Sequence, residues 1–348
     1  MVRTGRSPTQ MSTIYDVAKR AGVSTATVSR VLSHPDVVAP ATRTRVLRAV
    51  QRLAYTPNAA AKHLRTLRTG KLLVTVPDIS NPFFSLILRG IEDTAQREGY
   101  FVLVGDTQDD QAREEMYARM LKRKEADGLI FLGHRLPKEA ADFMRSLAPL
   151  TAPVVNGCEF SPRLGIPSVH IDNAKAAGDV MAHLYSLGHR RIGIVPGPLG
   201  SPLSRDRLQG ARASARKHRA TRDFVVMNGD FSIESGAVAG ARLLSRREPP
   251  TAIFCFNDEM AIGVYDTAHR LNLRIPDDLS VVGFDDVRFA RYMVPPLTTV
   301  AQPVREIGEG TVRLLMQILR DGSVAPEPVT LPHILTIRSS TAPAAPRK

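Results

Sequence analysis

The chain has 348 residues, of which 43% are hydrophobic and 23% charged, and it contains no tryptophan. This length allows two or three domains with buried cores. No apolar run approaches the roughly 20 residues of a membrane helix, and residues 1–11 lack the apolar core of a signal peptide. The two cysteines, Cys158 and Cys255, form no close-spaced motif, so nothing indicates an oxidising compartment. We expect a globular, cytoplasmic protein.

The positive charge is concentrated at the amino-terminal end. Residues 1–70 contain twelve Lys and Arg against two Asp and Glu, a net charge of +10 out of +13 for the whole chain. A positive field confined to one segment is what binding to DNA phosphates requires. We expect residues 1–11 to be a disordered basic tail and residues 12–56 to bind DNA.

Two short helices are predicted within residues 13–32. Thr13 is followed three residues later by Asp16, as in a capping box. Gly22 ends the first helix and supplies a tight turn, and Ser24 caps the second. Two helices joined by such a turn form a helix-turn-helix, although a plain helical hairpin has the same pattern. The second helix should bury Val28 and either Val31 or Leu32.

The outward positions of the second helix are Thr25, Ala26, Ser29 and Arg30. Short side chains and one arginine suit a helix that reads the major groove. A third helix over residues 41–54 should cover the first two through apolar side chains, which are Val46, Leu47, Val50 and Leu53.

Residues 57–70 are predicted to form a hinge helix and a linker. Pro57 can start a helix and the alanines after it favour one. So short a helix should be unfolded alone in water, so we expect it to fold on binding. The alternative is a plain linker.

From Lys71 onward, β-rich apolar runs alternate with helical patterns. The predicted strands are 72–76, 100–105, 128–132, 153–156, 169–171, 191–195, 224–227, 252–256 and 279–283, with a last strand near 331–337. The predicted helices are 82–98, 111–124, 138–147, 173–187, 205–218, 233–245, 258–271 and 304–319. Such alternation predicts an α/β fold of parallel sheets flanked by helices. Because these strands are many for one sheet, we expect two lobes.

Signatures of enzymes are absent from the sequence. It contains no H-E-x-x-H, C-x-x-C, G-x-S-x-G or P-loop pattern. The nine histidines do not cluster at ligand spacing. We therefore expect no catalytic residues, no bound metal and no cofactor.

Motifs along the whole chain resemble the LacI/GalR family of bacterial transcriptional repressors. They are Thr13–Leu32, Tyr55-x-Pro57-Asn58-x-x-Ala61-x-x-Leu64, Pro77-Asp78-Ile79-Ser80-Asn81-Pro82, Gly188-His189-Arg190-Arg191-Ile192, Arg205-Asp206-Arg207-Leu208-x-Gly210, Phe256-Asn257-Asp258-Glu259, Val282-Gly283-Phe284-Asp285-Asp286 and Pro295-Pro296-Leu297-Thr298-Thr299-Val300. Within the family, residues 133–137 and 168–173 resemble the cytidine-repressor branch.

The resemblance implies a periplasmic-binding-protein-like region over residues 71–341, with a ligand cleft between two lobes. It places three crossings between the lobes, near Asn173, Pro303 and Pro326. The amino-terminal lobe would comprise about 71–172 and 303–325, and the carboxyl-terminal lobe about 173–302 and 326–341. It also implies a homodimer on a near-palindromic operator.

The resemblance assigns DNA-binding roles to ten residues. Thr25, Ala26 and Arg30 match the positions that enter the major groove. Thr13, Ser24, Thr27 and Ser29 match positions that hold phosphates or caps. Leu64 matches a minor-groove wedge that kinks DNA, with a leucine in a small core as the alternative. Asn58 and Lys62 lie in the same segment, and Lys62 stands where some members carry arginine.

Six residues are candidates for effector binding, and four of them, Arg207, Phe231, Asn257 and Asp285, match family positions. Asp285 would accept hydrogen bonds from ligand hydroxyls, with a helix cap as the alternative. Arg207 would hold the ligand, with a surface ion pair as the alternative, and Asn257 would contact it or cap a helix. Phe83, Phe84 and Phe231 would stack on a ring, with core packing as the alternative.

Two departures from the family pattern bear on the ligand. Ser201 and Leu203 replace the arginine and threonine of purine-binding members, and residues 156–159 read Asn-Gly-Cys-Glu where an aspartate is common. A hydroxyl-rich nucleoside or sugar therefore fits better than a purine base. We expect a ligand-controlled transcriptional repressor. A solute-binding protein leaves residues 12–68 unexplained, and an architectural DNA-binding protein leaves the cleft unused.

Overall fold

The computed structural model describes residues 12–56, 68–147, 151–160, 164–221, 224–323 and 327–344. The chain divides into two compact units, one ending at Thr69 and the other starting at Gly70. The predicted tail, residues 1–11, and most of the predicted hinge segment, residues 57–67, lie outside the described residues. None of the helices in the described ranges combines the length and apolarity that a membrane span requires.

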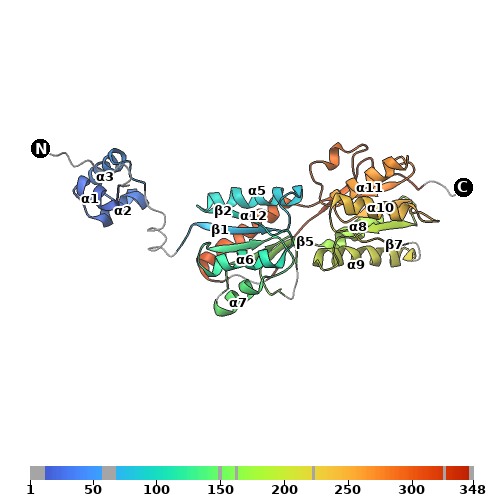
Figure 1. Ribbon diagram of the computed structural model, residues 1–348, viewed down its shortest axis with the longest axis horizontal. Coiled ribbons are helices and arrows are strands. Elements are labelled where there is room, and N and C mark those ends of the chain that lie inside the picture. Colours follow the sequence, from blue (N-terminus) through green and yellow to red (C-terminus); the bar gives the residue numbers. More distant parts are fainter. Residues whose placement is uncertain are drawn as a thin grey trace. The chain divides into compact units, whose positions relative to one another are not determined.

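The amino-terminal unit contains a helix-turn-helix and a third helix (Figure 1). Its elements are α1 (Ile14–Ala21), α2 (Thr25–Ser33), the 3-10 turn η1 (Pro35–Val37) and α3 (Pro40–Arg52). The capping box is confirmed, because the Thr13 side chain accepts from the Asp16 backbone and the Thr13 backbone N donates to the Asp16 carboxylate at 2.9 Å. Gly22 follows α1 with a left-handed φ of +64°, and the Ser24 side chain accepts from the Thr27 backbone. Local capping therefore sets both helix starts.

Small aliphatic side chains form the core of this unit. The buried members are Val17, Ala18, Ala21, Val28, Val31, Val46 and Ala49. The prediction that Leu47 belongs to this core is wrong, because Leu47 is 47% exposed. The inward face of α3 instead runs through Val46, Ala49, Val50 and Leu53. That spacing of three and four residues keeps one helix face inward and turns Leu47 outward.

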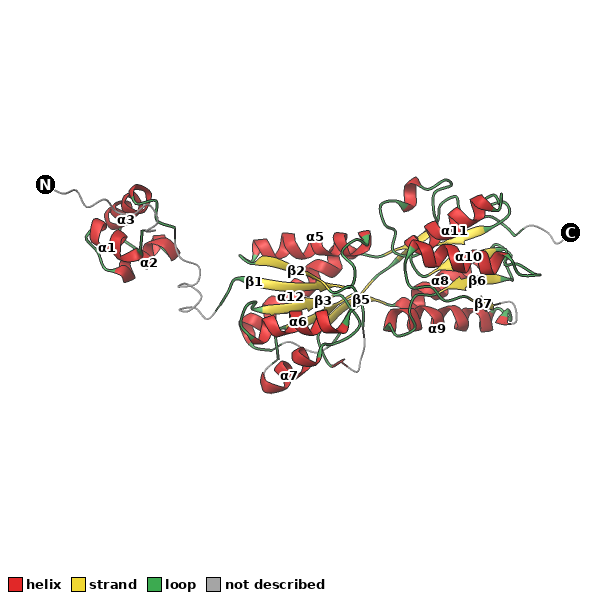
Figure 2. Cartoon of the chain, in the orientation of Figure 1, coloured by secondary structure: helices red, strands yellow, loops and turns green. Residues whose placement is uncertain are grey.

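The carboxyl-terminal unit contains two parallel sheets flanked by helices (Figure 2). The first has the strand order β11-β5-β4-β3-β1-β2. Its strands are β1 (Lys71–Val76), β2 (Phe101–Asp106), β3 (Gly128–Phe131), β4 (Val154–Gly157), β5 (Ser168–Ile171) and β11 (Val329–Leu331). Its helices are α5 (Pro82–Arg97), α6 (Gln111–Lys122), α7 (Lys138–Leu147) and α12 (Val304–Asp321). Leu72 packs in the cluster with α5 and α12, and Leu73 in the one with α6 and α7, as the alternation of a strand requires.

The second sheet has the strand order β7-β6-β8-β9, also parallel. Its strands are β6 (Ile192–Val195), β7 (Phe224–Val226), β8 (Ala252–Cys255) and β9 (Ser280–Val282). Its helices are α8 (Asn173–Ser186), α9 (Pro202–Lys217), α10 (Ile233–Leu244) and α11 (Asp258–Arg270), and a 3-10 turn η4 (Ala290–Tyr292) follows β9. Helices α8 and α9 approach closely, since a Cβ on Gly210 would lie 1.9 Å from the Ala174 carbonyl oxygen. The α/β fold with two parallel sheets is thus confirmed.

The chain passes between the two sheets three times. These passages follow β5, β10 (Thr299–Ala301) and β11, and β10 pairs antiparallel with β12 (Ile334–Thr336). The predicted crossing near Pro326 is placed too early, because Val329 and Leu331 still pair in parallel with Val169 and Ile171 of β5. Strand β11 has only three residues and two of them are exposed, so it leaves no apolar run in the sequence. Strand β10 was not predicted either.

Candidate functional site

The outer face of α2 carries the predicted base-reading residues. Ala26 and Arg30 are exposed and lie four residues apart, so they share one face of the helix. Thr25 is half-buried beside them, as are Thr27 and Ser29.

The remaining predicted contacts of this unit are polar groups at helix starts. The side chains of Ser24 and Thr27 lie 3.0 Å apart at the start of α2, and Thr13 is held in the capping box of α1. These three hydroxyls therefore have local structural roles. Asn58, Lys62 and Leu64 lie outside the described residues, and their roles stay predictions.

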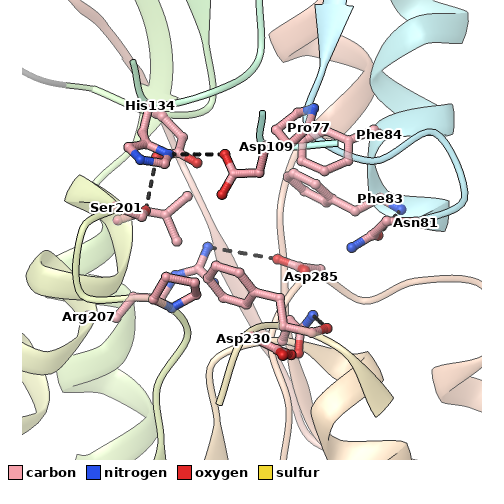
Figure 3. Close-up of a pocket in the computed structure, with 15 residues that line it drawn as sticks. Pro77, Asn81, Phe83, Phe84, Asp109, His134, Ser201, Arg207, Asp230 and Asp285 are labelled. Carbon is pink, nitrogen blue, oxygen red and sulfur yellow. Dashed lines mark hydrogen bonds and ion pairs between the residues drawn. The ribbon is translucent and has the colours of Figure 1, made fainter. Parts of the chain in front are cut away.

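A cavity of about 720 Å³, including its open mouth, lies in the carboxyl-terminal unit. Its lining is Pro77, Asn81, Phe83, Phe84, Asp109, His134, Glu159, Pro198, Ser201, Leu203, Arg207, Asp230, Phe231, Asn257 and Asp285 (Figure 3). All six predicted effector-binding residues are among them. Five of the others lie within three residues after a strand of one sheet or the other, namely Pro77, Asp109, His134, Glu159 and Pro198. The carboxyl ends of parallel strands are where α/β folds bind ligands.

Arg207 is buried in this cavity and held on several sides. Its Nε donates to Asn173 Oδ1 at 2.8 Å and its Nη1 donates to the Phe256 carbonyl. The guanidinium carbon lies 3.5 Å from the centroid of the Phe284 ring. Burial lowers the pKa of Arg207 to about 10, which Asp285 and Glu159 oppose. The surface ion pair considered for Arg207 is therefore wrong, because the side chain is 3% exposed.

Asp285 faces Arg207 across the cavity (Figure 3), with Oδ1 3.8 Å from Nη2. The same oxygen accepts from Gln302 Nε2 at 2.7 Å. Burial raises the pKa of Asp285 to about 7, against the influence of Arg207. Its φ of +111° lies where residues other than glycine are strained, and such strain is concentrated at functional sites.

Three aromatic rings line the cavity. Phe83 and Phe84 begin α5 and meet edge to face with centroids 5.3 Å apart. Phe83 is 6% exposed and belongs to the core, whereas Phe84 is half-buried. Phe231 has a φ of +76°, and its ring lies against Gly197, where a Cβ would be 2.1 Å from Cζ.

Asn257 caps α11 and also supports Phe231. Its Oδ1 accepts from the Met260 backbone at 2.9 Å, and its Nδ2 donates to the Phe231 carbonyl at 2.8 Å. The cap that the sequence left as an alternative is therefore present, and the residue still borders the cavity.

Six polar lining residues were missing from the predicted effector site, and besides Asn81 and Asp230 four of them lie near one another. These four are Asp109, His134, Glu159 and Ser201. Glu159 is 6% exposed and its Oε2 accepts from Ser201 Oγ at 2.9 Å. Burial lowers the pKa of His134, whose Nδ1 lies 3.9 Å from Asp109. Three of them follow β2, β3 and β4 as Asp285 follows β9, and that position was the available signal.

Metal ligands do not gather in the described part of the chain. Within those ranges, no group of three or more His, Cys, Asp or Glu side chains is arranged to hold an ion. Cys158 and Cys255 are both buried and free.

Two family models match the chain. Residues 13–58 match the model for bacterial regulatory proteins of the lacI family, and residues 181–341 match a periplasmic binding protein-like domain. The transcriptional repressor CytR of Escherichia coli K12 is 42% identical over 332 residues, which are 95% of this chain and 96% of that protein. Catabolite control protein A of Priestia megaterium is 38% identical, over 94% of this chain and 99% of that protein.

Solved structures agree with this assignment. The lac repressor dimer bound to operator and the anti-inducer ONPF has a TM-score of 0.86 at 29% identity, over 96% of this chain and all of that chain. A LacI-family regulator from Enterococcus faecium with bound ribose has a TM-score of 0.70 at 28% identity, over 78% of this chain and 99% of that chain. CytR is named as a transcriptional repressor, and the Enterococcus faecium protein as a transcriptional regulator. The chain belongs to the LacI family of bacterial regulatory proteins and is a DNA-binding transcriptional repressor under effector control.

Proposed function

We propose that a nucleoside or a sugar binds in the cavity and controls the affinity of a homodimer for a near-palindromic operator. The observation that carries this proposal is the convergence of all six candidate residues on one cavity. They come from segments between positions 83 and 285, and only folding brings them together.

The chemistry of the lining supports a hydroxylated ligand. Asp285 accepts and Arg207 donates, so the pair can hold vicinal hydroxyls from both sides. Phe84 and Phe231 offer ring faces for a sugar or a base, and Phe83 and Asn257 hold these rings in place. A solved relative holds ribose and another holds cellobiose.

At the DNA, we assign base contacts to Thr25, Ala26 and Arg30. Thr13, Ser24, Thr27 and Ser29 bind or orient phosphates, which sets register and not sequence. Asn58, Lys62 and Leu64 enter the minor groove, with Leu64 as the wedge.

Control requires that the ligand distinguish two arrangements of the lobes. The cavity lies beside the passages after β5 and β10, because Asn173 and Gln302 bond to Arg207 and Asp285. A ligand shifts such an equilibrium only by its difference in affinity for the two states, and a tenfold shift needs about 1.4 kcal/mol. The protein acts by binding alone, in the cytoplasm, where operator DNA is accessible.

Fluorescence anisotropy with DNA from upstream of the gene tests the proposal. The titrations are run on full-length protein without ligand, with a nucleoside panel and with a pentose and hexose panel. Operator affinity should change at least tenfold with one ligand class, and light scattering should give a dimer. Scrambled DNA of the same length is the control. Tight binding to DNA that no member of either panel alters would refute effector control by this chemistry.

A further inference from the structure

A buried carboxyl group stands in the cavity wall away from the pair of Arg207 and Asp285. Glu159 follows β4, is 6% exposed, and accepts the Ser201 hydroxyl on Oε2 at 2.9 Å. Ser201 is the residue before α9, beside the second sheet, and Glu159 follows β4 of the first sheet. Their hydrogen bond therefore connects the two halves of this unit. Figure 3 shows Ser201 near His134, on the side of the cavity where Asp109 also lies.

Among the buried carboxylates that the structure describes in this unit, Glu114 and Asp285 have an arginine within 4 Å, whereas Glu159 and Asp258 do not. Glu114 has Arg135 at 3.0 Å, and Asp285 has Arg207 at 3.8 Å. Within the described ranges of the chain, Glu159 takes part in no ion pair. A carboxylate without a cation at close range is costly to bury.

The charged and titratable groups around Glu159 do not compensate for that burial. Arg207 on α9 and Arg135 after β3 lower its pKa, and Asp109 raises it, but burial dominates and raises the pKa of Glu159 to about 8. His134 lies on the same wall and Cys158 precedes Glu159 in the chain. Burial lowers the pKa of the first and raises the pKa of the second well above its usual value. A pKa of about 8 makes the uncharged acid the main form of the group at neutral pH.

We propose that Glu159, positioned by Ser201, reads the heterocycle of a nucleoside as a neutral carboxylic acid that donates one hydrogen bond to an acceptor atom of the base. This inference rests on the proposed function, because it concerns the ligand of the same cavity. Because Oε2 accepts from Ser201, Oε1 is the oxygen left to carry the proton and to donate to a ligand in the cavity that Glu159 lines. A ring nitrogen or a carbonyl oxygen of a base can accept it.

The protonation state distinguishes a neutral Glu159 that donates to a base from a charged Glu159 that only accepts hydrogen bonds. A charged carboxylate only accepts hydrogen bonds and would hold a sugar hydroxyl. A neutral acid can be replaced by an amide of the same shape, because Gln offers one carbonyl acceptor and an N–H donor. Glu159→Gln is therefore the informative change, and Glu159→Ala is the change that removes the group.

Isothermal titration calorimetry on the full-length protein tests the proposal with cytidine, uridine, adenosine and free ribose between pH 6 and pH 9. For the best-bound nucleoside, wild-type affinity should be about fivefold weaker at pH 9 than at pH 7, because the neutral fraction of Glu159 falls about tenfold across a pKa near 8 while the ionised fraction of Asp285 rises about twofold. Glu159→Gln should bind within about threefold of wild type at pH 7 and lose the alkaline decline. Glu159→Ala should bind at least tenfold more weakly.

Asp285 also titrates near pH 7, and its ionisation strengthens the hold on hydroxyls. The rise in effector affinity that comes from ionisation of Asp285 should persist in Glu159→Gln. The decline in affinity at alkaline pH can therefore be assigned to Glu159 alone. Cys158→Ala is the matched control, and it should keep the decline above pH 8. Operator binding without ligand reports that every variant folds.

The outcomes separate the two proposals. If a nucleoside binds but Glu159→Gln loses tenfold or more, or if wild-type affinity rises between pH 7 and pH 9, then Glu159 acts as a charged acceptor and this inference is wrong. Preference for free ribose over every nucleoside would also overturn it, while leaving a sugar effector in place. If no nucleoside or sugar binds at any pH, the proposed function itself fails.

Discussion

Arg207 and Asp285 form a buried pair in the cavity, with Nη2 3.8 Å from Oδ1, and each is also tied to a segment that crosses between the sheets. Asn173 bonds to Arg207 at 2.8 Å at the start of α8, and Gln302 bonds to Asp285 at 2.7 Å before α12. The separation of 3.8 Å is longer than a direct charge-assisted hydrogen bond. A ligand hydroxyl that joins these two groups therefore acts on both crossings at once.

The first prediction concerns the charge of Asp285. Asp285→Asn keeps the shape of the side chain but removes a charged acceptor, whose hydrogen bonds are worth about 1.5–3 kcal/mol. Effector affinity should fall between about tenfold and a hundredfold by calorimetry. Operator affinity without effector should stay within about threefold of wild type.

Asp286→Asn is the matched control for that variant. Asp286 is the next residue, but its carboxylate pairs with Arg338 at 2.7 Å and does not line the cavity. Its effector affinity should remain near wild type. Equal losses for the two variants would mean that the loop after β9, and not the Asp285 carboxylate, determines binding.

The sequence predicted the helix-turn-helix well because its signals are local. Thr13, Gly22 and Ser24 act on backbone groups within four residues of themselves, so their roles can be read from spacing alone. Apart from β11, the strands of both sheets were predicted within one or two residues for the same reason, because each is a short apolar run. Strand β11 was missed because its pairing with β5 spans 160 positions in the sequence and buries little.

The cavity could be predicted only in part. Arg207, Phe231 and Asp285 came from the family resemblance, whereas Phe83 and Phe84 came from their place at a helix start after a proline. Glu159 and His134 follow strands in the same way, but nothing in their neighbours says that they turn toward Ser201 and Asp109. Those encounters join residues 25 to 42 positions apart. The protonation of Glu159 depends on burial, which no local pattern encodes.

The second prediction concerns the packing of the Phe231 ring against Gly197. A Cβ on Gly197 would lie 2.1 Å from Cζ of the Phe231 ring, so Gly197→Ala must displace that ring. The ring sits at the end of a side chain and can move, so the fold should survive. Effector affinity should fall at least about fivefold, an effect of about 1 kcal/mol, measured by calorimetry.

Gly200→Ala is the control for Gly197→Ala, because it adds the same methyl group without displacing a ring. Its Cβ would meet only His134 Nε2, at 4.0 Å, which is an ordinary contact. This variant should bind effector as wild type does. Unchanged binding by Gly197→Ala would place the Phe231 ring outside the ligand contacts.

The third prediction concerns stability and pH. The folded-state pKa of Glu159 is about 8 because of burial, against 4.5 in a model peptide. Between these values the folded state binds more protons than the unfolded state, so the contribution of Glu159 to the free energy of unfolding falls as pH rises. Glu159→Gln has no titrating carboxyl group, so it does not lose stability with rising pH at this position. The melting temperature of the variant minus that of wild type, by calorimetry without ligand, should increase from pH 5 to pH 8, and a constant difference would contradict the assignment.

The fourth prediction concerns the exposed face of α2. Arg30 is exposed one turn from Ala26, where a guanidinium can pair with guanine in two hydrogen bonds. Arg30→Ala should cost about 1–3 kcal/mol on the operator and much less on scrambled DNA, so that base preference relaxes. Anisotropy titrations on both DNAs at one fixed salt concentration measure the ratio.

Arg43 provides the comparison for Arg30. It lies on α3, where it is half-buried and 3.5 Å from Asp36, and its placement suits a phosphate contact. Arg43→Ala should therefore weaken binding to operator and scrambled DNA by similar factors and reduce the salt dependence by about one unit of slope. The two variants thus differ in the ratio of affinities and not merely in affinity. If Arg30→Ala weakens both DNAs equally, as Arg43→Ala should, the guanidinium of Arg30 binds the backbone and the sequence is read by other residues of α2.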